Sequence, residues 1–462
     1  MTTADEPLLT PHLPATPQAL AHPARPVPEG NLSDLSHARV REHGHRPFLT
    51  FYDDATGERT ELSYATFDNW VAKTANFLVE EIGVHRGQRV ATVLGNHWTT
   101  VVITFACWRA GACVVPLDAD DPLTQSRAVL GAARPAAAFV REELVTELDT
   151  LGHGSAFARV VAVGTGLGAR LTTDAGPATP YAEEVLAFAD DFDDPEVVQA
   201  DDALLVFPPR AGDAPAPVRL TQGNLLAAAD ALVVWGLDGD DRLLCTQPVQ
   251  LVDGLALAHL APFLAGSSVV LTRQFDPADF WRKVADERVT TAILSPTNLD
   301  GLAQSEASQR SVEGLRAVIC PTAASPDAAA GAEQALGLPL CQGHGLAEAS
   351  CASSLTPAEL DADTRRWLAE QHAVNVGVPT VHAQVSALAA DGRPLAHGAR
   401  GELAVRGPVV MAGYEGPAEL DDAVFAHGWL HTGDEGYVDV GPDGREQVFV
   451  TGRIPARRRP SG

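Results

Sequence analysis

Two carboxylates, Asp434 and Glu348, stand in glycine-rich surroundings that could place them against a ligand. Asp434 closes the run His431-Thr432-Gly433-Asp434, in which the glycine predicts a tight turn. A short carboxylate behind such a turn can accept hydrogen bonds from both hydroxyls of a vicinal diol. The same side chain could instead bind its own backbone, as aspartates in β-turns commonly do. Glu348 is similarly either a ligand-binding carboxylate or an ordinary acidic residue at a helix start.

The elements around Asp434 are expected to be β-strands. Glu402–Arg406 reads as a strand, and the pairs Asp391-Gly392 and Asp443-Gly444 are hairpin signals between alternating apolar and polar residues. The sequence therefore predicts a β-rich lobe over residues 375–453, followed by a basic tail over 454–462.

The chain before residue 375 alternates between buried-strand runs and helical patterns. This alternation predicts an α/β fold with parallel sheets covered by helices on both faces. We expect a first α/β sheet subdomain over residues 31–200 and a second over 201–374. Residues 1–30 carry seven prolines and are expected to be a disordered leader. Typical strand runs are Phe48–Tyr52, Val90–Leu94, Cys113–Leu117, Leu204–Phe207, Leu243–Cys245 and Ser268–Leu271.

Composition limits the function classes. The 462 residues include 33 basic and 60 acidic ones, for a formal net charge of -27, which argues against nucleic acid and membrane partners. The six cysteines form no CxxC pair, and this favours a reducing, cytoplasmic location. No signal peptide is evident, and no apolar run approaches the roughly 20 residues that cross a bilayer.

One glycine pattern has two readings. Gly164–Ala169 fits GxGxxA after a strand, but a dinucleotide fingerprint needs a helix directly behind it. The following residues, LTTDAGPATP, form a poor helix, so we favour a plain loop.

Several runs together resemble the motifs of the adenylate-forming superfamily, which contains acyl-CoA synthetases, luciferases and adenylation domains of peptide synthetases. They are Leu62–Tyr64, Trp108–Asp118, Gly343–Glu348 and Gly401–Asp439. The resemblance covers roughly residues 31–453. It implies an N-terminal core of two α/β sheet subdomains plus a β-rich lobe. The C-terminal domain of the family, with its catalytic lysine, is expected to be lacking.

The resemblance also implies roles for individual residues. Asp434 matches the acid that binds both ribose hydroxyls, and Arg453 matches an arginine that contacts the ribose. His344 and Gly345 fall in a nucleotide-binding motif, where His344 replaces the aromatic ring that usually stacks on adenine. Glu348 matches the catalytic residue that helps to hold Mg²⁺.

The phosphate loop departs from the family pattern. Family members have a loop rich in Gly, Ser and Thr that ends in Lys, whereas residues 208–217 here read PPRAGDAPAP. Ala216 stands where the lysine is expected, Asp213 would repel an anion, and the prolines lack N–H donors. Arg210 could restore some positive charge beside Gly212. The sequence therefore predicts a degenerate phosphate loop.

The family acyl pocket maps to Val252, Gly254 and Asn298. The resemblance implies an enzyme that uses ATP and Mg²⁺ to activate a small-molecule carboxylate, possibly a fatty acid, as acyl-AMP. CoA or a carrier pantetheine would accept the acyl group, and a separate C-terminal domain or carrier protein would be the partner. The alternative is a catalytically degenerate core that binds an adenylate, an acyl ligand or a protein partner without turnover.

Overall fold

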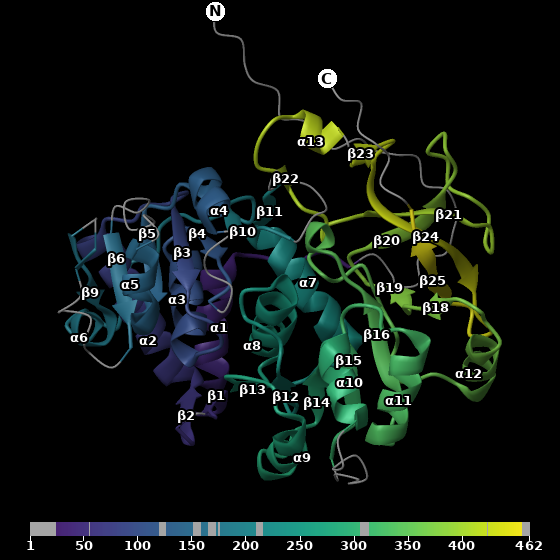
Figure 1. Ribbon diagram of the computed structural model, residues 1–462, viewed down its shortest axis with the longest axis horizontal. Helices are drawn as coiled ribbons and strands as arrows, with labels where there is room; N and C mark the ends of the chain where they lie inside the picture. The colour runs from purple at the N-terminus through teal and green to yellow at the C-terminus, as the bar shows by residue number, and fades with distance from the viewer. Residues whose placement is uncertain are drawn as a thin grey trace, which may run out of the picture.

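The computed structural model describes residues 25–54, 56–119, 126–150, 159–164, 172–173, 176–208, 216–304, 314–422 and 424–454. Within them the strands form an eight-stranded, a nine-stranded and a six-stranded sheet, with one further two-stranded pair. Figure 1 shows the first two sheets with helices packed against them and the six-stranded sheet beside the second. The predicted α/β class, with two sheet subdomains and a β-rich lobe, is confirmed.

The eight-stranded sheet has the order β22-β11-β10-β4-β3-β5-β6-β9. The pairs from β10 to β9 are parallel, whereas β11 and β22 are antiparallel additions at one edge. The strands are β3 (Arg89–Val93), β4 (Cys113–Pro116), β5 (Ala137–Arg141), β6 (Arg159–Val163), β9 (Thr179–Pro180), β10 (Asp202–Val206), β11 (Val218–Thr221) and β22 (Gly413–Tyr414). A separate pair joins β7 (Thr172–Thr173) to β8 (Gly176–Pro177).

The nine-stranded sheet has the order β19-β17-β16-β15-β14-β12-β13-β1-β2. Its strands are β1 (Pro47–Asp53), β2 (Glu58–Ser63), β12 (Arg242–Cys245), β13 (Ser268–Thr272), β14 (Thr291–Ile293), β15 (Ala317–Cys320), β16 (Leu340–His344), β17 (Ser354–Leu355) and β19 (Val378–Pro379). The pairs from β16 to β1 are parallel, so the carboxyl ends of these strands meet at one edge.

The two α/β sheets exchange strands. The hairpin of β1 and β2 comes early in the chain but joins the nine-stranded sheet, while β10 and β11 come after residue 200 and join the eight-stranded one. The division predicted at residue 200 therefore does not coincide with a division between the sheets. Hydrophobic periodicity identifies strands but does not say which sheet each one joins.

The six-stranded sheet carries the region around Asp434. Its strands are β18 (Val374–Asn375), β20 (Gln384–Leu388), β21 (Gly401–Arg406), β23 (Phe425–Ala426), β24 (Trp429–Val440) and β25 (Glu446–Arg453). The predicted hairpin turn at Asp443-Gly444 joins β24 to β25.

The helices are α1 (Leu32–His43), α2 (Tyr64–Asn76), α3 (Trp98–Arg109), α4 (Ser126–Ala133), α5 (Glu142–Thr150), α6 (Tyr181–Val185), α7 (Gln222–Trp235), α8 (Ala261–Ala265), α9 (Pro277–Asp286), α10 (Pro296–Gln304), α11 (Pro326–Leu336), α12 (Ala362–Ala369) and α13 (Glu419–Asp422). The π-helices η1 (Phe77–Ile82) and η4 (Asp253–Leu260) and the 3₁₀-helix η5 (Ala347–Ala349) complete the set.

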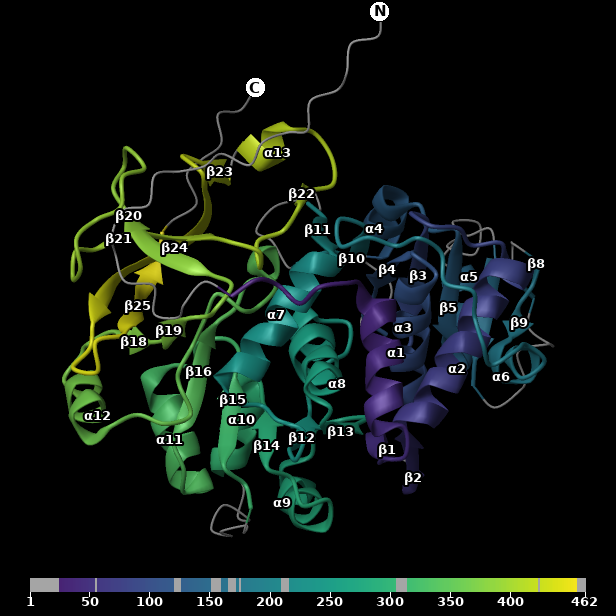
Figure 2. The same ribbon diagram turned by 180° about the vertical axis from the view of Figure 1, so that it is seen from behind.

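Helix α7 lies at the centre of the molecule in both views (Figures 1 and 2). Its N-terminus is fixed by a capping box, in which Thr221 and Asn224 each bind the other's backbone N–H. Every residue from Gln222 to Leu232 except Gly223 is buried, so this part of the helix is enclosed on all sides. The amide of Asn224 also donates to the carbonyls of Pro408 and Val410, which ties α7 to the segment that precedes β22.

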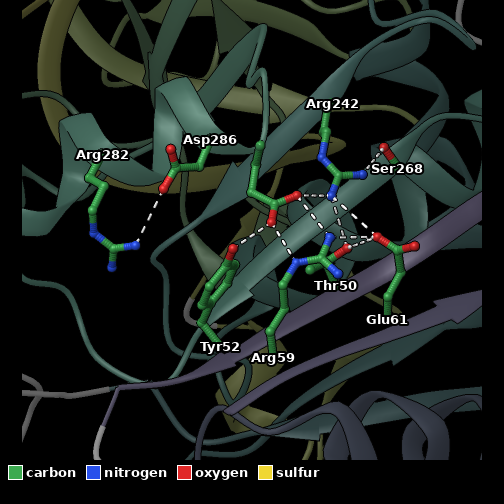
Figure 3. A network of polar contacts seen from close by, with 9 residues as sticks. Thr50, Tyr52, Arg59, Glu61, Arg242, Ser268, Arg282 and Asp286 are labelled. Carbon is green, nitrogen blue, oxygen red and sulfur yellow. Dashed lines mark hydrogen bonds and ion pairs between the residues drawn. The ribbon is translucent and has the colours of Figure 1, made fainter. Parts of the chain in front are cut away.

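A buried charge network fixes the β1–β2 hairpin to the rest of its sheet (Figure 3). The carboxylate of Glu287 accepts from Tyr52 Oη at 2.5 Å, from Arg59 Nε at 2.7 Å and from Arg242. Burial alone would raise the pKa of Glu287, but these hydrogen bonds outweigh it and lower the pKa to about 2. The network joins side chains from β1, β2 and β12 and so holds these strands together.

Three predicted segments lie largely or wholly outside the described residues. They are the proline-rich leader up to residue 24, the GxGxxA run beyond Gly164, and the basic tail from residue 455. Within the described part of the chain, no helix has both the length and the apolar character needed to cross a bilayer.

Candidate functional site

Asp434 lies within the long strand β24, and not in the tight turn that the sequence predicts. Across the β21–β24 ladder, His431 faces Ala404 and Glu435 faces Glu402, so β24 has two extra residues in between. Gly433 takes up this excess with a φ of 75°, in the left-handed region that favours glycine. The predicted turn is therefore a bulge, a feature that re-aims a side chain out of a strand.

The carboxylate of Asp434 contacts two other residues that the sequence singled out. Its Oδ2 lies 2.7 Å from His344 Nε2, and its Oδ1 lies 3.3 Å from Arg453 Nη1. Arg453 faces Asp434 directly in the β24–β25 ladder, whereas His344 comes from the end of β16 in the nine-stranded sheet. Asp434 thus binds side chains from two sheets, and these contacts do not match the alternative in which it binds its own backbone.

Ser353 holds the other side of the His344 ring, and sequence reasoning missed it. Its Oγ lies 3.0 Å from His344 Nδ1 and also donates to the His344 backbone carbonyl. Ser353 is fully buried. The antiparallel pairing of β16 with β17 brings these residues together, since His344 faces Ser354 in that ladder. A single serine in the sequence carries no signal of that pairing.

Gly345 and its neighbour Gly343 allow the backbone to pass close to a facing segment. A Cβ on Gly345 would lie 2.8 Å from the carbonyl oxygen of Pro321, and one on Gly343 would lie 2.9 Å from the same atom. Real Cβ atoms essentially never approach backbone oxygen so closely, so these positions require glycine. They set the path of the chain on both sides of His344.

Glu348 lies in the short helix η5, one turn beyond His344. Its Oε1 accepts a hydrogen bond of 2.8 Å from Tyr414 Oη, and its backbone carbonyl accepts from Met411. Among the described residues, no three His, Cys, Asp or Glu side chains gather as a metal site. A single carboxylate still fits Mg²⁺, which usually takes its other ligands from substrate phosphates and water.

A mainly apolar pocket adjoins this group. Together with the solvent at its mouth it holds about 320 Å³ of empty space. It lies between α7, η4 and the carboxyl ends of β15 and β16, and Gly343 forms part of its wall directly before His344. Residues that line it include Leu232, Leu257, Ile319, Gly343, Cys351 and Ala352.

None of the three residues predicted for the acyl pocket lines this pocket. Val252 is buried, and Gly254 packs so tightly that a Cβ there would lie 2.3 Å from the carbonyl oxygen of Pro248. Asn298 donates to Thr246 Oγ1 at 2.9 Å. The residue of η4 that lines the pocket is Leu257, three positions beyond Gly254, and the acyl role of the three predicted residues stays a prediction.

Asp253 begins η4 and is buried without a salt-bridge partner among the described residues. Its Oδ1 accepts from the Gly254 N–H at 3.1 Å. Burial raises the pKa of Asp253 to about 6 because the charged form is poorly solvated there.

Most of the predicted phosphate loop lies outside the described residues, including Arg210, Gly212 and Asp213. Ala216 is described and is buried directly before β11. A buried alanine offers no charge to a phosphate group. The prediction of a degenerate loop stays a prediction for the remaining positions.

Comparison with known proteins gives consistent results. The family model for AMP-binding enzymes matches residues 36–415. A feruloyl-CoA synthase from an Amycolatopsis species is 32% identical over 383 residues, which cover 82% of this chain and 72% of the relative. An indoleacetate–CoA ligase from Aromatoleum aromaticum is 28% identical over 402 residues, covering 85% of this chain and 74% of the relative.

A solved structure shows the same fold. The long-chain-fatty-acid–CoA ligase from Archaeoglobus fulgidus superposes with a TM-score of 0.80 at 19% sequence identity, covering 95% of this chain and 87% of that one. This similarity concerns the fold alone.

Proposed function

This chain belongs to the AMP-binding enzyme family, and from that premise we propose that it activates a carboxylic acid as an acyl adenylate, for transfer to CoA or a carrier thiol. The observation that carries the proposal is the convergence of His344, Asp434 and Arg453, which come from three strands of two sheets. These residues stand at the positions that match adenine and ribose contacts in the family.

Each of these residues has a specific role in the proposed reaction. Asp434 accepts hydrogen bonds from the ribose hydroxyls, and the imidazole of His344 lies against the adenine. Arg453, whose side chain is 77% exposed, is free to turn between Asp434 and the nucleotide. Glu348 would hold Mg²⁺, which would supply positive charge opposite the phosphates. Together these residues orient the α-phosphorus toward the carboxylate that attacks it, and pyrophosphate leaves.

The pocket beside His344 supports an aryl or compact apolar acid as the substrate. Gly343 lines the pocket while the next residue contacts Asp434, so an acyl group there would lie next to a nucleotide on Asp434. The named relatives act on feruloyl and indoleacetate groups, which are aryl acids of this kind. We therefore place aryl acids ahead of the fatty acids suggested by the wider family.

A second candidate function is binding without turnover. The observation in its favour is Ala216, a buried residue at the position of the phosphate-binding lysine. A core of this type would bind AMP or an acyl adenylate without turnover. Its partner would be a separate C-terminal domain or a carrier protein.

The two candidates both bind AMP and differ in turnover. We expect AMP or a non-hydrolysable aryl-adenylate analogue to bind more tightly than ATP, because the adenine and ribose positions are kept while the phosphate loop lacks donors. Calorimetric titration measures the dissociation constants, and pyrophosphate exchange with a panel of aryl and fatty acids measures adenylation. ATP binding at least tenfold tighter than AMP would contradict this expectation. Exchange that depends on an aryl acid would establish the ligase, and its absence with intact AMP binding would favour binding without turnover.

A further inference from the structure

Both oxygens of the Asp434 carboxylate are engaged within the protein itself. Oδ2 contacts His344 and Oδ1 contacts Arg453, at 2.7 and 3.3 Å. The Asp434 side chain is 15% exposed and that of His344 is 8% exposed, so the ring covers most of the access to the carboxylate. A ribose diol that binds Asp434 has to take hydrogen-bonding positions that His344 holds.

Ser353 determines which way the His344 ring faces. Its Oγ lies 3.0 Å from Nδ1 and donates to the His344 backbone carbonyl, so Ser353 contacts both the ring and the main chain of the same residue. With Nδ1 held on Ser353, the opposite ring nitrogen, Nε2, lies against Oδ2 of Asp434.

We propose that Ser353 positions the His344 ring so that its Nε2 competes with the ribose diol for Asp434, and that these two residues therefore set nucleotide affinity. Ser353 acts as a positioning residue, because it touches His344 and not the ligand. The inference rests on the proposed ribose-binding function of Asp434. In this proposal His344 opposes ribose binding at Asp434, in addition to any contact that its ring makes with adenine.

The competition reduces affinity by a calculable factor. If the His344–Asp434 contact is formed in about nine-tenths of the molecules, only about one-tenth are free to bind AMP. The apparent dissociation constant for AMP then rises about tenfold. A charge-assisted hydrogen bond is strong enough to hold such a population. Removal of the ring nitrogen that contacts Asp434 should lower the apparent dissociation constant for AMP by this factor.

Calorimetric titration of the full chain with AMP tests the proposal in three variants. His344→Phe keeps a flat ring but removes the nitrogen that faces Asp434, and we expect AMP to bind about tenfold tighter. Ser353→Ala removes the contact that holds Nδ1, so the ring can turn away from Asp434 and its contact with the carboxylate weakens; we expect about threefold tighter binding. Ser267→Ala is the matched control, since Ser267 is equally buried and donates to the Pro262 carbonyl, and it should not change AMP affinity.

NMR of the imidazole N–H groups gives a readout that a purely structural role would not change. The wild type should show a slowly exchanging Nε2–H signal that disappears in His344→Phe. AMP should shift this signal, because the ribose diol takes the place of the ring on Asp434. In Ser353→Ala the signal should exchange faster with water. An Nε2–H signal that saturating AMP leaves unmoved would overturn the competition.

The outcomes distinguish a failure of the competition at Asp434 from a failure of the proposed function. If AMP binds measurably to the wild type and His344→Phe binds no more tightly, the competition is refuted while the proposed function stands. If no variant binds AMP, both the ribose role of Asp434 and the competition are refuted. Binding that is detectable only in His344→Phe would support both.

Discussion

At the scale of single residues, the proposed nucleoside binding depends most on Asp434. We expect Asp434→Ala to weaken AMP binding by about 1.5–3 kcal/mol, because hydrogen bonds to a charged group contribute that much. The variant also leaves His344 without its carboxylate partner, so its fold should be checked by circular dichroism. Asp439→Ala is the control, since Asp439 lies on the same strand and its carboxylate accepts from the local Val440 N–H. Equal AMP affinities in both folded variants would return Asp434 to a structural role.

Asp253 should make stability depend on pH. Its pKa is raised to about 6 in the folded protein from an ordinary value near 3.8, so the folded state holds the proton more tightly. The contribution of Asp253 to stability is therefore fully present below about pH 4 and is lost as pH rises through about 6. Asp253→Asn should raise the free energy of unfolding at pH 8 by about 2–3 kcal/mol and change it little at pH 4.

Urea unfolding at both pH values measures this difference. Asp240→Asn is the control, because the Asp240 side chain is fully exposed. A gain in Asp253→Asn that is equal at both pH values would mean that packing, and not the charge, is responsible.

Sequence reasoning found the charged residues of the site but not their supports. Asp434, His344 and Arg453 stand in recognisable motifs, and the structure brings them into contact although 90 residues separate His344 from Asp434. Ser353 and the pocket residue Leu257 stand in no motif. Their positions follow from strand pairing and from the pitch of a π-helix, which residue types alone do not specify.

At the scale of elements, the loop between β10 and β11 should limit ATP binding. Replacing residues 208–217 with a loop rich in Gly, Ser and Thr that ends in Lys should strengthen ATP binding by about 2–4 kcal/mol, from two charge-assisted contacts. Ala216→Lys alone should help less, because residue 216 is buried and a lysine there has to move out of the core.

AMP affinity is the internal reference for the grafted loop. It should stay constant in both variants, since AMP lacks the phosphates that the loop would bind. If the graft leaves ATP affinity unchanged, the weakness of the phosphate site lies outside residues 208–217.

At the scale of the whole molecule, the predicted sheets are present, but each α/β sheet contains strands from distant parts of the sequence. Hairpin β1–β2 and strands β10–β11 join sheets formed mainly by other parts of the chain. Strand runs are visible as hydrophobic patterns, whereas sheet order depends on which faces pack together. The Glu287 network illustrates this, because Glu287 binds both Arg59 and Arg242, which lie 183 positions apart.

The candidate site depends on the orientation of the six-stranded sheet, since Asp434 lies on that sheet and His344 on the nine-stranded one. A buried pair helps to hold this orientation. His382, in the segment between β19 and β20, lies 2.8 Å from Asp230 Oδ2 on α7, and both side chains are 1% exposed. Arg25 reaches the other oxygen of Asp230 at 2.9 Å. Figure 2 shows the segment after Arg25 crossing α7 on its way to α1.

We expect Asp230→Ala to lower the free energy of unfolding by about 3–5 kcal/mol, because it leaves His382 buried without a partner. Hydrogen exchange should accelerate in β20, β21 and β24 more than in β3, β4 and β5, since the loss falls on the contact between α7 and the six-stranded sheet. AMP affinity should fall as well, although Asp230 lies outside the His344–Asp434 pair. Asp240→Asn again serves as the control. Uniform acceleration across all sheets, with unchanged AMP affinity, would show that the Asp230–His382 pair stabilises the fold without orienting the site.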